Sequence, residues 1–181
     1  ESALLRASVG TGFKAPTLSE LYGSKSDGYI KFIDRKACAA NSASCNAIEY
    51  HVLGGGNKDL KEEKAIAASL GTVIQPSSRF AFSIDGWYTK VKNIVGIDFE
   101  ALTQAEQNGV DTTKYGVIVN RDINGEIEEI IAPNLNLQEE ELAGIDFNME
   151  LNISSNFYGH QLVFENDFSY MLFDKMEGFP G

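Results

Sequence analysis

The chain has 181 residues, with 26 acidic against 15 basic side chains and a formal net charge of −11. This acidic balance argues against nucleic-acid binding, which needs a basic surface. A transmembrane helix is excluded, because there is no apolar run of about eighteen residues. Membrane-spanning β-strands remain possible, since their side chains alternate and never form such a run. The chain begins with Glu1, so we expect a processed product or a piece of a longer protein.

Alternation of apolar and polar side chains predicts β-strands along most of the chain. The pattern is clearest where Ile145, Phe147 and Met149 alternate with Asp146 and Asn148. Strict alternation indicates a sheet with one apolar face and one polar face. The five predicted strands cover about residues 3–12, 64–75, 79–94, 141–153 and 160–173.

Strand length and loop length favour a membrane wall over a soluble sheet. Ordinary strands run about five to six residues, whereas a tilted strand needs about nine to eleven residues to cross a bilayer. Long connections at about 13–63 and 95–140 alternate with short turns at Pro76–Ser78 and Ser154–Gly159. Outer-membrane barrels show the same contrast between short turns and long outside loops. The alternative is a soluble antiparallel sheet with one packed side and one solvated side.

The second long connection contains a predicted hairpin and many acidic residues. Segments 117–120 and 127–131 flank a turn that ends in Asn124-Gly125, the dipeptide preferred in two-residue hairpin loops. From Val91 to Leu142 there are eleven acidic and three basic residues, a net charge of 3 − 11 = −8. We interpret this segment as a solvated surface in preference to a cation-binding one.

The remaining chemistry-bearing residues predict a disulfide and no catalytic site. Cys38 and Cys45 are close in a loop of small residues, which favours a local disulfide over free thiols. His51 and His160 are far apart in sequence, and neither lies in a recognisable catalytic or metal motif. Residues 54–56 are three glycines without the Lys-Ser/Thr of a phosphate loop. We therefore expect no enzyme activity, no cofactor and no bound metal.

Three segments resemble stretches found in TonB-dependent outer-membrane receptors. Residues 12–22, GFKAPTLSELY, are similar to a GF-x-A-P-x-L-x-E-L-Y stretch in that family. Residues 57–63, NKDLKEE, resemble the N-P-D-L-K-P-E stretch that opens the next strand, with Lys58 and Glu62 in place of prolines. Residues 134–147, NLNLQEEELAGIDF, resemble another strand start in the same barrel.

This resemblance implies that residues 1–181 are one partial barrel domain: an all-β, antiparallel fragment of about five strands with two long extracellular loops. The receptors lie in the Gram-negative outer membrane, contact its lipid, and receive energy from TonB through a plug domain. They import scarce nutrients, for which we expect a ferric siderophore first, and otherwise cobalamin, haem or a glycan. The candidate ligand contacts in the loops are Tyr29, Phe32, Tyr50, Tyr115 and Arg121.

Two other functions fit parts of the sequence. A secreted, disulfide-bearing β-sheet module would recognise a sugar or a protein through the long loops. A passive porin-like channel would share the wall but not the segments at 12–22 and 57–63. A binding module is expected to fold in buffer and to bury both faces of its strands.

Overall fold

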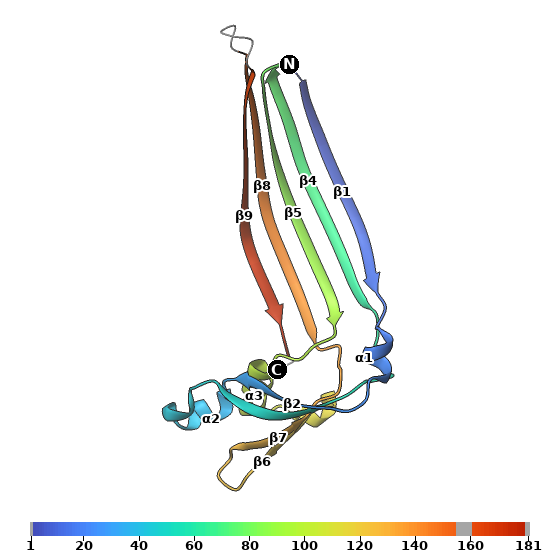
Figure 1. Ribbon diagram of the computed structural model, residues 1–181, viewed down its shortest axis with the longest axis vertical. Coiled ribbons are helices and arrows are strands. Elements are labelled where there is room, and N and C mark those ends of the chain that lie inside the picture. Colours follow the sequence, from blue (N-terminus) through green and yellow to red (C-terminus); the bar gives the residue numbers. More distant parts are fainter. Residues whose placement is uncertain (1, 155–160, 180–181) are drawn as a thin grey trace. The chain divides into compact units, whose positions relative to one another are not determined.

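A computed structural model describes residues 2–154 and 161–179 (Figure 1). The chain divides into two compact units, which are described separately. The first, called the sheet unit, comprises Glu1–Gly12, Ala65–Val91 and Glu140–Lys175. The second, called the loop unit, comprises Phe13–Lys64, Lys92–Glu139 and Met176–Gly181.

The sheet unit contains five long strands in one open antiparallel sheet, in the order β1-β4-β5-β8-β9. This confirms the predicted all-β fold. The turn expected at Pro76–Ser78 is shifted, because the second strand continues through Pro76 to Ser77. The second expected turn, at Ser154–Gly159, and His160 fall almost entirely outside the described residues. The strands are β1 (Ser2–Lys14), β4 (Glu63–Ser77), β5 (Phe80–Ile94), β8 (Gln138–Ser154) and β9 (Gln161–Glu177).

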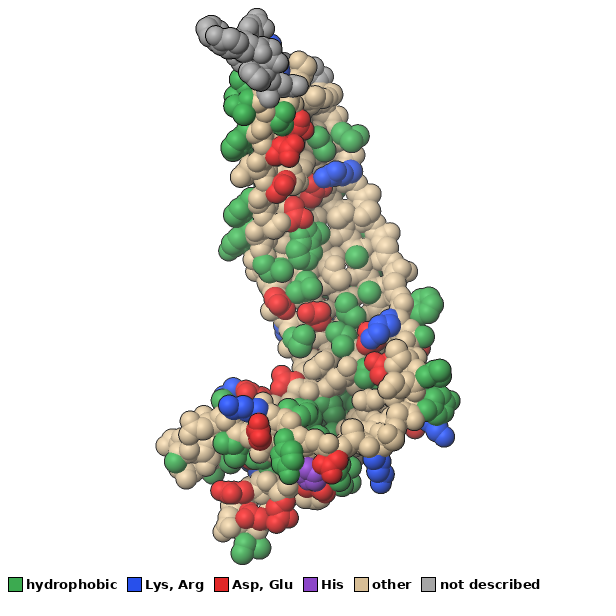
Figure 2. All heavy atoms as spheres, in the orientation of Figure 1, with side chains coloured by type: hydrophobic (Ala, Val, Ile, Leu, Met, Phe, Trp, Pro, Cys, Tyr) green, Lys and Arg blue, Asp and Glu red, His purple; other side chains and the backbone are tan. Residues whose placement is uncertain are grey.

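One face of this sheet carries polar contacts between side chains of different strands. Arg6 forms an ion pair with Asp85, which joins side chains from β1 and β5 across β4. Asn148 on β8 accepts a hydrogen bond from the Ser83 hydroxyl at 3.1 Å and donates one to Asp167 at 2.6 Å. Acidic side chains gather along the sheet on the face seen in Figure 2.

The opposite face is apolar and remains exposed. Leu70 is 59% exposed, and Phe164 and Phe168 are 50% and 58% exposed. On β5 and β8 the rings of Phe82 and Phe147 lie 6.4 Å apart. No packed interior covers this face among the described residues, so the sheet has one polar face and one uncovered apolar face, as the predicted membrane wall requires.

Gly144 on β8 lets the indole of Trp87 on β5 lie against the backbone. A Cβ at this position would meet the Trp87 ring at 2.5 Å and the Tyr170 carbonyl oxygen at 3.0 Å. Gly144→Ala is therefore expected to destabilise the folded barrel by about 1–3 kcal/mol, the usual cost of overpacking. The measurement is the unfolding midpoint of the intact barrel. Gly10→Ala on β1 is the control, because nothing lies within 4 Å of the place that its added Cβ would take; equal midpoints for both variants would contradict the prediction.

The loop unit has its own secondary structure, most of which the sequence did not predict. Its four-stranded sheet has the order β2-β3-β7-β6. The pairing of β6 with β7 is antiparallel and confirms the expected hairpin. Most of residues 13–63, expected to be a loop, instead forms two strands and short helices. The elements are α1 (Leu18–Tyr22), β2 (Ser26–Phe32), α2 (Arg35–Ala40), η1 (Ser42–Ser44), β3 (Ile48–Gly54), α3 (Phe99–Gln107), η2 (Thr112–Tyr115), β6 (Ile118–Arg121) and β7 (Ile127–Ile131).

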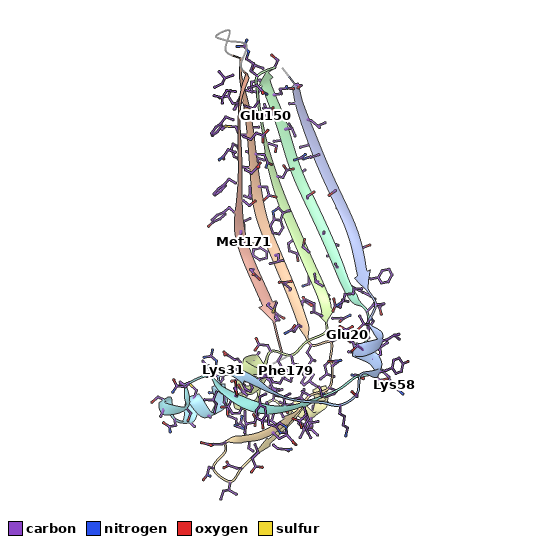
Figure 3. The ribbon with its side chains drawn as sticks, viewed as in Figure 1. Glu20, Lys31, Lys58, Glu150, Met171 and Phe179 are labelled. Carbon is purple, nitrogen blue, oxygen red and sulfur yellow. A yellow bond between two sulfur atoms is a disulfide. The ribbon has the colours of Figure 1, made fainter. Side chains whose placement is uncertain are left out.

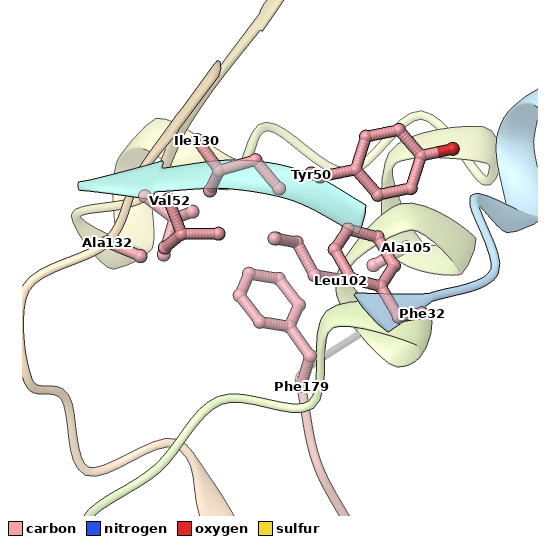
Figure 4. Packing of buried hydrophobic residues seen from close by; sticks show 9 residues of the cluster. Phe32, Tyr50, Val52, Leu102, Ala105, Ile130, Ala132 and Phe179 are labelled. Carbon is pink, nitrogen blue, oxygen red and sulfur yellow. The ribbon is translucent and has the colours of Figure 1, made fainter. Parts of the chain in front are cut away.

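Side chains from three separate stretches of the chain form the core of the loop unit (Figure 4). Phe32, on β2, comes from the first long connection. Leu102 and Ile130, both fully buried, come from the second. Phe179, which follows β9, lies among the loop-unit side chains (Figure 3) and is 8% exposed. The core therefore holds both connections and the segment after β9 together.

Helix caps fix the start of each longer helix in this unit. Thr17 and Glu20 form a reciprocal capping box at α1, and the side chains of Asp34 and Asp98 accept backbone N–H groups at α2 and α3. Such caps satisfy the N–H groups that lack partners within a helix. None of the helices in the described residues is long and apolar enough to cross a membrane.

Candidate functional site

A buried ion network joins the two long connections. The Arg121 guanidinium donates from Nη1 to Asp34 Oδ2 at 2.6 Å and from Nη2 to Glu106 Oε2 at 2.7 Å. Lys36 Nζ lies 2.6 Å from Glu106 Oε1. Asp34 is 1% exposed, and the Arg121 side chain is 11% exposed. Charges this deeply buried need partners, and here each has at least one.

The network also shifts the pKa values of Glu106 and Arg121. Burial alone would raise the pKa of Glu106, but hydrogen bonds from Arg121 and Lys36 outweigh it and hold the pKa below its ordinary value. Burial alone would lower the pKa of Arg121, and the hydrogen bonds to Asp34 and Glu106 raise it instead. Both side chains therefore stay charged at neutral pH.

A second set of contacts joins α2 to α3 beside this network. The backbone N–H of Arg35 donates to Thr103 Oγ1 at 2.9 Å, and that of Ile33 donates to Glu100 Oε1 at 3.3 Å. The Arg35 side chain also pairs with Glu100, at a more exposed position. A disulfide joins Cys38, in α2, to Cys45, which directly follows η1, with the two Cα atoms 4.5 Å apart.

A groove opens beside this framework, between β3 and β7. The two strands are parallel and pair only where Val52 and Leu53 meet Ile130 and Ile131. Towards their N-terminal ends they are not paired with each other, and a cavity of about 540 Å³ lies there. Its volume is in the range of small-molecule sites, about 300–1,000 Å³. The lining residues come from β2, β3, β7, α2 and the disulfide loop.

The groove is acidic and contains aromatic side chains. Glu49, Glu126 and Glu128 line it with exposed side chains, and no Lys or Arg is among its lining residues. The rings of Tyr29 and His51 lie 5.4 Å apart at its edge. His51 Nε2 is 2.8 Å from an Asp27 carboxylate oxygen, which orients the imidazole. No group of three or more His, Cys, Asp or Glu in the described part of the chain is placed to hold a metal ion.

The structure separates the five predicted ligand contacts into different environments. Tyr29 is 70% exposed and lines the groove. Tyr50 also lines it but is only 9% exposed, with its ring 4.6 Å from that of Phe32 in the core. Tyr115 packs edge-on against Phe179 at 5.2 Å. Phe32 and Arg121 are buried in the core and the ion network, so a ligand at the surface does not reach them.

The sequence patterns did not single out the groove carboxylates. The sequence does contain a signal for Glu126 and Glu128, because the predicted hairpin places both residues at the start of its second strand. Glu49 and His51 had none, because β3 was expected to be loop. The Arg121 partners were also missed; Asp34 lies 87 residues away in sequence.

Comparison with known proteins identifies the fold. The family model described as "TonB dependent receptor-like, beta-barrel" matches residues 1–179. No curated protein matches the chain. The siderophore receptor PirA from Acinetobacter baumannii is 19% identical with a TM-score of 0.55; the match covers 94% of this chain and 21% of that one. The siderophore receptor PirA from Pseudomonas aeruginosa is 15% identical with a TM-score of 0.54; the match covers 98% and 26%.

At these identities the two solved structures establish a shared fold and nothing more specific. The chain spans 21% and 26% of their lengths, so it corresponds to part of such a barrel. The family model, in contrast, covers nearly all of the residues. The chain therefore belongs to the TonB-dependent receptor β-barrel family, whose members are proteins of the Gram-negative outer membrane.

Proposed function

We propose that this chain is part of an outer-membrane receptor that binds a scarce nutrient and imports it with TonB-coupled energy. The nutrient expected first is a ferric siderophore, followed by cobalamin, haem or a glycan. The family consists of receptors and transporters, not enzymes. Two solved structures with the same fold are described as siderophore receptors.

The observation that carries the proposal is the sheet with one polar face and one exposed apolar face. Its strands have 13 to 17 residues, more than a bilayer crossing requires. The long connections between them fold into a unit that contains a groove, as ligand capture above a barrel requires. TonB would act through the plug domain of the family, and outer-membrane lipid would cover the apolar face.

The alternative of a soluble binding module fits this geometry less well. Such a module would bury the apolar side of its strands, but Leu70, Phe164 and Phe168 are at least half exposed. Exposed apolar area of this extent marks a surface made for lipid or for a partner. The ligand candidates retained from the sequence are Tyr29 and Tyr50, which line the groove, and Tyr115, which is partly exposed.

Uptake of radiolabelled iron tests the proposal. Cells that depend on the intact receptor are expected to accumulate iron from at least one ferric chelate, and to lose this uptake when TonB is removed. A point mutant of the plug segment that contacts TonB is the control for receptor expression, because it should still bind the chelate at the cell surface. Uptake that continues unchanged without TonB would contradict active transport and favour a passive channel.

A further inference from the structure

The groove between β3 and β7 carries an uncompensated negative charge. Glu49, Glu126 and Glu128 have exposed side chains and form no ion pair in the described part of the chain. The fourth lining carboxylate, Asp34, is already paired with Arg121. Apart from His51, whose ring lies between the carboxylates of Asp27 and Glu129, the lining contributes three unpaired negative charges and no Lys or Arg. The carboxylates do not converge on a metal site, so this field favours an organic cation over a bare metal ion.

A second feature of the groove, independent of its charge, is the hydroxyl group of Tyr50. The residue is only 9% exposed, yet it lines the groove. Its hydroxyl forms no hydrogen bond with a described residue, and the oxygen is accessible from the groove, because no buried side-chain polar atom in the described part of the chain lacks a partner. Figure 4 shows the oxygen pointing away from the core side chains that surround the ring. A hydroxyl group at the surface of a groove, without a protein partner, is available to water or to a ligand.

The environment of Tyr50 keeps that hydroxyl protonated. Burial raises the pKa of the phenol, and the negative charge of Asp34 raises it further. A neutral phenol accepts a hydrogen bond from an ammonium group and donates one to a carbonyl oxygen. Together with the exposed carboxylates of Glu126 and Glu128, it offers an amine both a charge partner and a directional contact.

We propose that this groove binds the protonated amine of a metal chelate, so that the receptor selects amine-bearing chelates over anionic ones. This inference rests on the proposed function and specifies the substrate class of the same receptor. Three like charges in the groove would repel a chelate with a net negative charge, such as a ferric tris-catecholate. The ring of Tyr29, which is exposed at the groove edge, adds an aromatic face that attracts a cation.

A matched pair of chelates tests this selection on the intact receptor purified in detergent. Ferric desferrioxamine B has a free terminal amine, and its N-acetyl derivative carries in its place a neutral amide with one added acetyl group. Acetylation is expected to weaken binding about tenfold or more, the effect of losing one charge-assisted hydrogen bond. Isothermal titration calorimetry gives both dissociation constants, and a ferric tris-catecholate serves as the anionic probe.

Variants of the groove identify where the discrimination arises. The double substitution Glu126→Gln and Glu128→Gln is expected to reduce the difference between the two chelates to about threefold or less, because both charges are removed. Tyr50→Phe keeps the ring in the core and deletes only the hydroxyl; it should weaken the amine-bearing chelate about threefold to tenfold. Asp59→Asn is the matched control, since Asp59 is exposed and does not line the groove, and the substitution removes one charge.

The outcomes separate this inference from the proposed function. Equal binding of the free and acetylated chelates, or tighter binding of the catecholate, overturns the amine selection but leaves TonB-dependent uptake intact. A loss of discrimination in Asp59→Asn as large as in the double variant also overturns it, because the effect would then be one of overall charge. Absence of binding to all three chelates, together with absence of iron uptake, would overturn both.

Discussion

Arg121→Met is expected to destabilise the loop unit by about 3–5 kcal/mol, the cost of leaving buried charges without their partner. The substitution preserves much of the side-chain volume. It removes the cation that neutralises Asp34, which is 1% exposed and keeps only the backbone N–H groups of the α2 cap as partners, and it leaves Glu106 with Lys36 alone. Hydrogen exchange in the intact receptor measures the effect. Protection of amides in α2, α3 and β6 should fall on the order of a hundredfold or more.

Arg35→Met is the matched control for this prediction. Arg35 also pairs with a carboxylate, that of Glu100, but the two side chains are 43% and 37% exposed. Exposed ion pairs contribute about 0–1 kcal/mol, so its exchange pattern should change little. If the two arginine variants lost protection equally, the buried network would not be what holds the connections together.

The same network predicts the response of the loop unit to acid. The pKa of Glu106 is lower in the folded protein than in the unfolded chain. Its contribution to stability is therefore complete above the unfolded pKa, near the ordinary glutamate value of 4.5, and is lost as pH falls through the folded pKa. Protection factors in α3, which correct for the intrinsic pH dependence of amide exchange, should fall with acidification below that value in the wild type, and less steeply in Arg121→Met.

Ala68→Arg is expected to destabilise the barrel by about 2–4 kcal/mol, the cost of placing an arginine against the hydrocarbon core. Ala68 lies on β4 with Ile66 and Leu70 on its apolar face. A guanidinium there must either leave water or distort the bilayer. The measurement is the free energy of unfolding of the intact barrel in lipid vesicles, from a denaturant titration.

Ala67→Arg, one residue away on the same strand, is the control for the identity of the two faces. Ala67 shares its face with Ser69, whose hydroxyl lies 2.8 Å from that of Ser8. The polar face is the one that we assign to water, so the added charge should cost much less there. A larger loss for Ala67→Arg than for Ala68→Arg would reverse that assignment and remove the basis for a membrane wall.

The long strands were predictable because each has two different environments. One face carries polar side chains and the other carries apolar ones, so β8 alternates over many residues. The hairpin of the loop unit was predictable for another local reason, the Asn-Gly dipeptide between its two strands. The turn itself differs from the expected Asn-Gly loop, because the Gly125 N–H donates to the Asp122 carbonyl and so centres the turn on Ile123 and Asn124. Gly125 follows with a φ of 86°, which glycine adopts without strain.

The rest of the loop unit could not be predicted because distant contacts stabilise it. Strand β2 contains Asp27 and Gly28 and alternates poorly; its order comes from pairing with β3 and from the burial of Phe32. Helix α3 had an unused local signal, the Asp98 cap followed by Leu102 and Ala105 at helical spacing. The groove needs the register of β3 and β7, which belong to different long connections, and no local pattern contains that register.

The shared core of the loop unit has a consequence for engineering this receptor. Phe32, Leu102, Ile130 and Phe179 come from three stretches of chain but fill one interior. Transplanting either long connection alone into another barrel would expose part of that interior and separate Arg121 from Asp34. The loop unit can be moved between barrels only if all three stretches are exchanged together.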